Sequence, residues 1–437
     1  MIWTLPVWAQ SPLSLKEAVG MALRQNPQLQ AAHSGVSAAA TRIAAARSGY
    51  LPKLNYSEFF LRGNNPVYVF SSLLTQARFS ERNFALPTLN RPDFLNNFQS
   101  QLVLEQPVYD AGQTRMAVRA AELGRSLAGE DARRAEQNVI AQVVRTYFGA
   151  VLAAESVKTA EEALRSAEAD LARARAMRGA GLITDADVLS LQVHVAAMRE
   201  QLIRRQADLE VARAALNDTL GLPLDTAHDL ATPLEPAKLP EVLLAELEKA
   251  AVEQRPEIRQ ADLAVRLAAN QKAAARASLL PQLVFRGVFE TDRQRFVTRG
   301  AANWLAAVSL RWNLFNGFAD RERIRESGFL VERAQAELHR AQSLVRLQVR
   351  KAHADWTAAG QRIEVSRAAI QQAEESLRIT KNRYQNGLAT VTELLRTETA
   401  LLQARNRYLA ALYDQRVAAA ELALASGVLA PDSPVLD

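Results

Sequence analysis

The 437-residue sequence contains no cysteine, and this absence excludes disulfides, thiolate chemistry, cysteine-based zinc sites and lipidation of an N-terminal cysteine. It also contains no run of 18 consecutive apolar residues, so no transmembrane helix is expected. The five histidines show no metal-ligand spacing, and there is no glycine-rich phosphate loop. We therefore expect neither an enzyme nor a resident metal or cofactor.

Aromatic residues make up only 6% of the chain although hydrophobic residues make up 49%, because alanine supplies much of the apolar content. A composition rich in Ala, Arg, Glu and Gln favours long helices. The net charge of +6 is mild, and the basic residues alternate with Asp and Glu. This pattern indicates solvated helix faces more than a nucleic-acid footprint, so we expect no nucleic-acid partner.

Residues 1–10, "MIWTLPVWAQ", resemble the end of a secretory signal. Val7 and Ala9 occupy the small-residue positions before a cleavage site, but no basic region precedes the short apolar stretch. We interpret the segment as the remnant of a signal, and it suggests secretion.

The chain is a tandem repeat. "ARSGYLPKL" from Ala46 is matched by "ARASLLPQL" from Ala275, a shift of 229 residues, whereas "QPVYDAG" is matched by "WNLFNGF" at a shift of 206. The first copy must therefore carry an insertion between its two strands. We place the repeats at 13–231 and 242–429, joined by a proline-containing linker at 232–241 and followed by a tail at 430–437.

Each repeat predicts the same order: helix, two strands, long helix, glycine-centred turn and helix. The long helices carry apolar residues every seven positions with small residues between them, which is typical of coiled coils. The first long helix, about 110–179, is roughly twice the length of its neighbours, about 14–49 and 183–220. We therefore expect antiparallel columns whose helix turns, at 179–184 and 385–390, are hairpin tips.

Four short strands complete the prediction of a mainly α fold with a small β part. They span about 54–62, 97–108, 283–291 and 303–315. In the last strand apolar and polar residues alternate, and Trp304 and Trp312 lie about 26 Å apart, near opposite edges of a membrane band. Phe98 lies on the corresponding face of the second strand, so these three aromatics are candidate membrane-interface residues.

A half-buried sheet of a soluble protein alternates in the same way. Four strands cannot close a membrane barrel, because such barrels begin at about eight strands and an open edge is not left in lipid. If these are membrane strands, several copies of the chain must share one transmembrane barrel.

From about Leu13 to Leu429 the chain resembles the TolC family of bacterial outer-membrane factors. The resemblance rests on the doubled order of elements, on "PVYDAG" and "NLFNGF" before the long helices, and on the turn G-L-x-T-x-x-[DE] at Gly181 and Gly387. It implies a homotrimer with a shared barrel in outer-membrane lipid and a helical tunnel in the periplasm. Such a protein is the exit duct of an efflux or type I secretion system and works with a periplasmic adaptor and an inner-membrane pump.

The resemblance also implies roles for residues at the hairpin tips. The adaptor-contacting positions are Gly181, Leu182, Thr184, Gly387, Leu388 and Thr390. Glycine suits a turn there for structural reasons alone. Just inside the tips, Tyr384 and Asp187 match a polar link that closes the entrance, and Glu393 matches an acidic ring.

Asp185 and Arg383 complete the predicted gate. Asp185 lies with Asp187 in the first turn of a helix, where acidic residues favour the helix dipole, so we expect capping or gating here and not metal binding. The sequence departs from the family at Ala389, where some members carry an arginine, and at Arg396, where they carry a second acidic residue.

The alternative function is a coiled-coil scaffold or adhesion protein whose short strands form a dimerisation sheet. It explains the heptads, but it does not predict tryptophans at both ends of an alternating strand. The insertion in the first strand pair also favours the channel hypothesis, because barrels carry their long loops on the external side.

Overall fold

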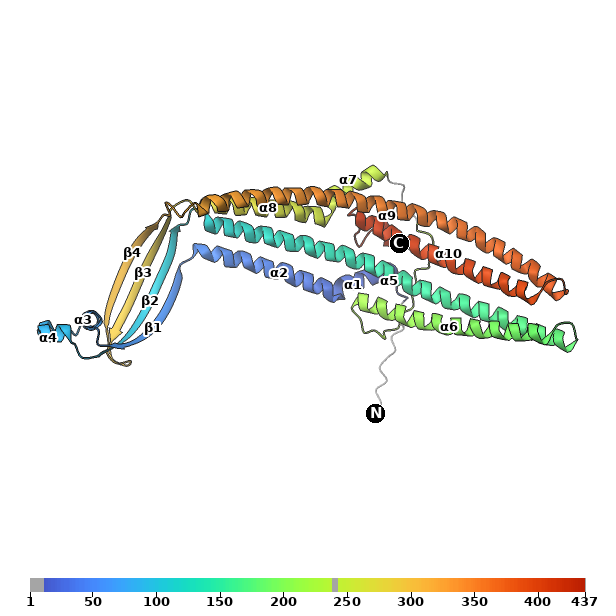
Figure 1. The fold of residues 1–437 in the computed structure, drawn as a ribbon, viewed down its shortest axis with the longest axis horizontal. Coiled ribbons are helices and arrows are strands. Elements are labelled where there is room, and N and C mark those ends of the chain that lie inside the picture. Colours follow the sequence, from blue (N-terminus) through green and yellow to red (C-terminus); the bar gives the residue numbers. More distant parts are fainter. Residues whose placement is uncertain (1–11, 238–242, 437) are drawn as a thin grey trace, which may run out of the picture. The chain divides into compact units, whose positions relative to one another are not determined.

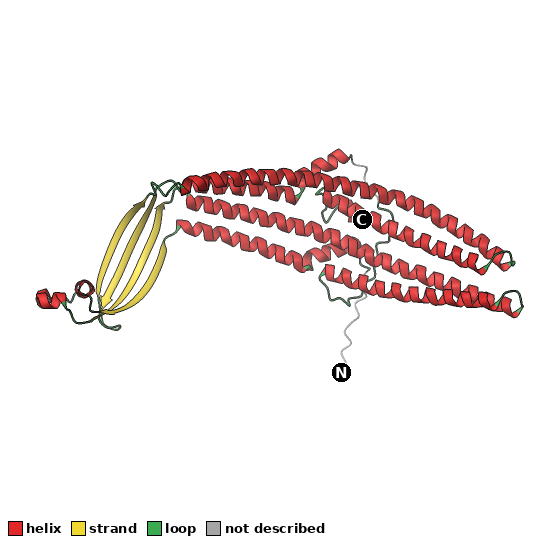
Figure 2. Ribbon diagram, viewed as in Figure 1, coloured by secondary structure: helices red, strands yellow, loops and turns green. Residues whose placement is uncertain are grey.

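The computed structural model describes residues 12–237 and 243–436. The predicted signal remnant and part of the 232–241 linker lie outside the described residues. The described chain is mainly helical with one small antiparallel sheet (Figure 2), so the predicted fold class is confirmed.

Ten α-helices and four strands are described in this part of the chain. The helices are α1 (Leu15–Gln25), α2 (Pro27–Arg47), α3 (Pro66–Thr75), α4 (Leu86–Asn90), α5 (Gln113–Gly179), α6 (Asp185–Leu220), α7 (Leu244–Gln254), α8 (Pro256–Ala277), α9 (Ala319–Gln385) and α10 (Val391–Ala425). The strands are β1 (Lys53–Gly63), β2 (Leu95–Tyr109), β3 (Gln282–Arg293) and β4 (Ala301–Arg311). None of the helices in the described ranges is both long enough and apolar enough to cross a membrane.

The tandem repeat is visible in the elements themselves. The long helices α5 and α9 each contain 67 residues, and they begin at Gln113 and Ala319, the shift of 206 seen in the sequence. Helices α2 and α8 both begin at a proline, Pro27 and Pro256, which reproduces the shift of 229. Apart from α3 and α4, which lie between β1 and β2, the two repeats therefore fold into the same series of helices and strands in the described chain.

The helix expected over 14–49 is divided into α1 and α2. Pro27 begins α2, and the preceding Asn26 has an extended backbone with ψ 123°. Proline disfavours the helical conformation of the residue before it, which explains the break. The side-chain Nδ2 of Asn26 donates to the Thr219 carbonyl at 2.9 Å and thereby fixes this junction against α6.

The chain forms two compact units, and the first comprises Met1–Val36, Ala128–Asp262 and Glu337–Asp437. Its largest core surrounds the buried rings of Tyr147 and Phe148 on α5. The Tyr147 hydroxyl donates to the Leu13 carbonyl at 2.8 Å and accepts from the Thr232 amide at 2.9 Å. Val435 and Leu436 of the predicted tail are buried in the same core, so the tail is part of this unit.

The second unit comprises Ser37–Leu127 and Leu263–Ala336 and contains the sheet. The strands are ordered β1-β2-β3-β4, all antiparallel, and the central β2–β3 pair joins the two repeats (Figure 1). Strand β4 ends at Arg311, which pairs with Gln282 at the start of β3. Trp312 therefore lies one residue beyond the strand, and β4 ends earlier than the predicted strand, which extended to residue 315.

Candidate functional site at the two helical hairpins

Gly181 sets the turn between α5 and α6. Its φ of +75° lies in the left-handed region that glycine adopts without a steric penalty. The Gly181 amide donates to the Arg178 carbonyl at 2.8 Å, and the Leu182 amide donates to the Met177 carbonyl at 2.9 Å. These two bonds form a Schellman motif, which satisfies the last carbonyls of α5 and reverses the chain.

Gly387 builds the same turn between α9 and α10 (Figure 1). Its φ is +71°, its amide donates to the Tyr384 carbonyl at 3.1 Å, and the Leu388 amide donates to the Arg383 carbonyl at 2.8 Å. The structure thus repeats one turn at two hairpins within the first unit.

Each tip presents an exposed leucine. The exposed fractions are 70% for Leu182 and 68% for Leu388. The next residue of each turn, Ile183 and Ala389, is partly buried and packs against the core between the hairpins. Because the turns fix the direction of these side chains, one apolar residue per tip is held in solvent.

Thr184 and Thr390 are N-caps, and the carboxylates predicted for the gate complete their capping boxes. The Thr184 amide donates to Asp187 Oδ2 at 3.0 Å, and the Thr390 amide donates to Glu393 Oε2 at 3.2 Å. Each threonine hydroxyl in turn accepts from the amide of its carboxylate residue. Asp187 and Glu393 therefore stabilise the start of α6 and α10.

Two further predicted gate residues, Asp185 and Arg383, also form contacts at the tips. Asp185 forms an ion pair with Arg178 across the first turn, and both side chains are exposed. The guanidinium of Arg383 donates to the Leu388 carbonyl at 3.2 Å across the second turn. Within one protomer these charges support the turn conformations.

Tyr384 is buried between the hairpins, with 4% of its surface exposed. Its hydroxyl makes no hydrogen bond within the described residues. Burial raises the pKa of the hydroxyl, and the negative charges of Asp187 and Asp170 raise it further. Within the described chain no hydrogen bond joins Tyr384 to Asp187, although the charge of Asp187 acts on the hydroxyl.

A buried polar network, which the sequence analysis missed, lies further along the hairpins and takes one ionisable side chain from each of the four helices. It consists of Asp170 on α5, His194 on α6, Lys381 on α9 and Glu398 on α10. Lys381 Nζ lies 2.9 Å from Asp170 Oδ2 and 3.3 Å from Glu398 Oε1. The exposed side-chain fractions of the two carboxylates are only 3% and 8%.

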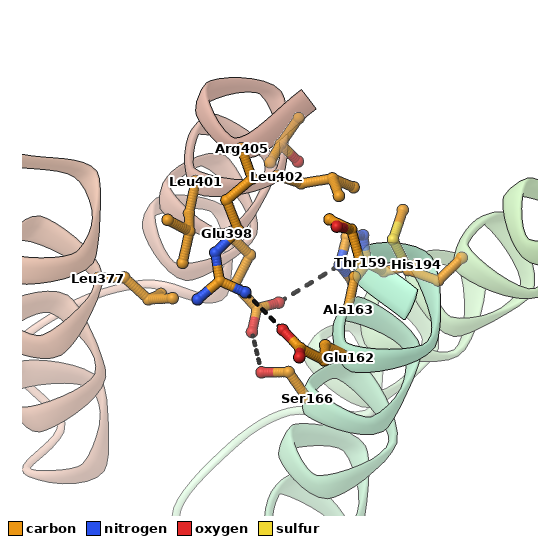
Figure 3. A pocket seen from close by; sticks show the side chains of 12 residues that line it. Thr159, Glu162, Ala163, Ser166, His194, Leu377, Glu398, Leu401, Leu402 and Arg405 are labelled. Carbon is orange, nitrogen blue, oxygen red and sulfur yellow. Dashed lines mark hydrogen bonds and ion pairs between the residues drawn. The ribbon is translucent and has the colours of Figure 1, made fainter. Parts of the chain in front are cut away.

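Glu398 is the centre of this buried network. Its carboxylate lies 3.3 Å from His194 Nε2 and accepts from Ser166 Oγ at 3.1 Å (Figure 3). A neighbouring cavity of about 160 Å³ is crossed by the Arg405–Glu162 ion pair, at 2.8 Å. The hairpins are therefore joined through charged groups as well as through the apolar core near the tips.

The two carboxyls of the network differ in proton affinity. Burial, reinforced by the neighbouring Glu398, raises the pKa of Asp170 to about 6. Burial also acts to raise the pKa of Glu398, but the hydrogen bonds with His194 and Asp170 and the charge of Lys381 lower it to about 2. Asp170 is therefore the carboxyl of this pair that takes up a proton in mildly acidic conditions.

The predicted membrane-interface aromatics lie in the second unit. Trp304 is 79% exposed, and Trp312 is also exposed while its Nε1 donates to the Leu279 carbonyl at 3.0 Å. Phe98 packs against Phe60, with ring centroids 4.6 Å apart. Among the described residues no cluster of three or more His, Asp or Glu side chains is suited to hold a metal ion.

Comparison with known proteins identifies the architecture. The model of the outer membrane efflux protein family matches residues 18–222 and 247–428. The chain is 30% identical to Protein CyaE of Bordetella pertussis over 427 residues, covering 95% of this chain and 84% of that protein. It is 26% identical to the alkaline protease secretion protein AprF of Pseudomonas aeruginosa, covering 95% of this chain and 85% of AprF.

Solved structures of similar fold include outer-membrane channels. The CmeC outer membrane channel of Campylobacter jejuni superimposes with a TM-score of 0.80 at 18% identity, covering 97% of this chain and 90% of CmeC. A CusC structure gives a TM-score of 0.78 at 18% identity, covering 98% and 95%. The chain therefore belongs to the outer membrane efflux protein family, and it is an outer-membrane channel protein whose helices extend into the periplasm.

Proposed function

We propose that three copies of this chain form one export duct that receives its cargo from an inner-membrane pump through a periplasmic adaptor. The observation that carries this proposal is the four-stranded sheet. One face of β4 exposes Trp304, Val308 and Leu310, and within the described residues β1 and β4 each pair with only one strand. Four strands are too few to close a barrel, so pairing β4 of one copy with β1 of the next supplies the missing strands.

The adaptor docks at the hairpin tips in this proposal. Leu182 and Leu388 are the exposed apolar contacts, and the left-handed glycines 181 and 387 keep the backbone free of side chains. Within the described chain, a Cβ added at either glycine meets no atom within 4 Å, so each tip has open space for an approaching helix. The N-cap residues Thr184 and Thr390 stabilise the conformation of these turns.

The gate includes one buried group without a hydrogen-bond partner among the described residues of the protomer. The buried Tyr384 hydroxyl is unpaired in the described residues, and an orphaned buried hydroxyl is costly. We infer that Tyr384 pairs with Asp187 when the entrance is closed. Asp187, Glu393, Asp185 and Arg383 surround the entrance and set its charge.

We propose a secreted polypeptide as the cargo. AprF and the proteases secretion protein PrtF of Dickeya chrysanthemi, two relatives named for protein secretion, align with 95% and 90% of this chain. We therefore place the duct in a type I secretion system. Its test is the appearance of the cargo polypeptide in the medium of a strain that depends on this chain.

The first experiment combines light scattering of the detergent-extracted protein with single-channel recording in a planar bilayer. A trimeric mass with a small, mostly closed conductance supports the duct. A monomer or dimer without conductance contradicts it and favours the coiled-coil scaffold.

The gate is tested by Tyr384→Phe combined with Asp187→Gln, because glutamine preserves the capping box while it removes the charge. We expect longer openings in the double variant. Glu17→Gln, the same kind of change in the capping box of α1 away from the tips, is the matched control for the capping function. An unchanged conductance in the double variant contradicts the proposed Tyr384–Asp187 link.

A further inference from the structure

The connection between β1 and β2 is much longer than its repeat counterpart. Residues 64–94 join β1 to β2, whereas residues 294–300 join β3 to β4. The longer connection contains α3 and α4 (Figure 1), and it accounts for the insertion inferred from the sequence. It lies at the strand ends opposite to those that lead into α2 and α5, since β1 follows α2 and β2 precedes α5.

Helix α3 crosses the sheet and makes contacts from the first strand to the last. Near its start, the Tyr68 hydroxyl donates to the Leu61 carbonyl of β1 at 3.0 Å. Just beyond its end, Gln76 Nε2 donates to the Asn97 Oδ1 of β2 at 2.9 Å. Asn303 Nδ2 of β4 donates to the Thr75 carbonyl at 3.2 Å. Hydrogen bonds thus attach the α3 segment both to the first strand of the sheet, β1, and to the last, β4.

These contacts lie on the polar face of the sheet. Asn97 has the same strand parity as Gln99, and Gln99 pairs with Asp292 of β3. Asn303 is opposite Glu290, which accepts from Gln99 Nε2 at 3.1 Å. Trp304 follows Asn303 and therefore points to the other face. Helix α3 therefore lies over one end of the polar face, away from the exposed tryptophan.

The anchor of α3 is a buried polar cluster. Asn97 Nδ2 donates to Asp292 Oδ1, and Asn97 in turn accepts from Gln76, so the three side chains form a chain of hydrogen bonds. All three are buried, and Asp292 is only 1% exposed. Buried hydrogen-bonded polar groups specify one arrangement, because breaking any bond leaves a desolvated partner unpaired.

The opposite side of α3 is apolar and open. Val69, Ser72 and Gln76 are buried, whereas Val67 and Leu74 are more than half exposed, and Phe70 is the third residue of this exposed stripe. The stripe recurs at the helical spacing of three to four residues. Phe70 is held by an edge contact with Phe79, at 4.9 Å between ring centroids, so the stripe belongs to a folded segment.

We infer that α3 is a constriction of the outer mouth of the channel and that it limits the size of what passes. The inference rests on the proposed shared barrel, in which the polar face of the sheet is the inner wall. In a barrel the sheet is curved, so a helix that contacts its first and last strands on the inner face projects into the lumen instead of following the wall. Three symmetry-related copies of α3 then narrow the opening, and their exposed Val67, Phe70 and Leu74 side chains face one another across it.

The direct test replaces residues 64–94 with the short 294–300 sequence and compares the single-channel conductance of fully open events, in which the periplasmic entrance does not limit the current, with that of the wild type. We expect this open-state conductance to increase at least twofold. A trimeric variant that conducts like the wild type overturns the inference. A wild type that conducts nothing contradicts the proposed channel instead, so the two failures are distinguishable.

A second test avoids the deletion and uses the absence of native cysteine. In the Leu74→Cys variant, a cationic thiosulfonate reagent added on the external side is expected to reduce the current by more than half, because Leu74 lies in the lumen. The matched control is Arg295→Cys in the short connection, where labelling is expected to leave the current unchanged. Full labelling of Leu74→Cys without a change in current contradicts the inference.

Discussion

The ammonium of Lys381 on α9 lies 2.9 Å from the carboxylate of Asp170 on α5, and this contact joins the second helical hairpin to the first. Asp170 also pairs with Arg173 of its own helix at 3.1 Å, and Lys381 reaches Glu398 on α10. Removing Lys381 therefore leaves two buried carboxylates with less positive charge between the hairpins than they have in the native chain.

Lys381→Met is expected to lower the free energy of unfolding by about 3 kcal/mol, because removing one partner of a buried ion pair leaves an uncompensated charge. Thermal unfolding of the detergent-extracted protein measures this. Arg378→Met is the matched control on the same helix: Arg378 pairs with Glu375 in solvent, so no measurable change is expected.

Adding Asp170→Asn to Lys381→Met tests whether the loss comes from the contact itself. Because the asparagine carries no charge, the double variant is expected to recover part of the stability lost in the single variant. Additive losses contradict a direct coupling between the two side chains.

The stability of the hairpin pair is expected to increase as the pH falls from 7.5 to 5.5. Asp170 has a pKa of about 6 in the folded chain, above the ordinary value of 3.8. The folded state therefore binds more protons in this window, and acidification stabilises it by about 1 kcal/mol per protomer. Glu398 acts in the opposite sense, but only as the pH falls from 4.5 towards about 2, below this range.

The measurement is thermal unfolding at both pH values for the wild type and Asp170→Asn. The variant is expected to lose the acid stabilisation. Other groups face this pair: Arg173 on α5, His194 on α6, Lys381 on α9 and Arg405 on α10. Since His194 contacts Glu398, His194→Gln is the control that separates its contribution. An unchanged pH response in Asp170→Asn contradicts the assignment to Asp170.

Gly181→Ala and Gly387→Ala are each expected to destabilise their hairpin by about 1 kcal/mol. Both glycines have a left-handed φ, which costs any residue with a Cβ about this much, and within the described chain the added methyl group meets no atom within 4 Å. Amide hydrogen exchange of the tip residues should accelerate accordingly.

Gly129→Ala is the control for the glycine substitutions. It lies inside α5, where alanine is preferred over glycine by about 1 kcal/mol, so a small stabilisation is expected. If the tip variants also become more stable, the left-handed turns described here are contradicted.

Much of the fold is local in origin and was predicted from the sequence. The turns at Gly181 and Gly387 carry their own glycine and threonine cap, and the repeat of 206 residues locates α9 once α5 is recognised. The division of the first helix at Asn26 was missed although Pro27 signals it, because a proline is also compatible with a kink in one helix.

The buried polar network was missed because its members are far apart in sequence and resemble solvated charges. The local signal was present: Asp170 lies between the buried Ala167 and Ala174, and Lys381 lies between Leu377 and Tyr384, at the spacing of an apolar stripe. A charged residue within an apolar stripe indicates that it has a buried partner on another helix. The identity of that partner follows only from the packing of all four helices.

Val308→Arg tests whether the sheet faces lipid. Val308 is exposed on the Trp304 face of β4, midway between Trp304 and Trp312. An arginine at the bilayer midplane costs about 2–4 kcal/mol, whereas the same change near the interface, Trp304→Arg, costs about 0–1 kcal/mol. Ser309→Arg, on the polar face, is the matched control and is expected to be tolerated. Unfolding from lipid vesicles by guanidinium gives the three stabilities. If the arginines at 308 and 309 are tolerated equally, the Trp304 face does not contact lipid, and the shared barrel is contradicted.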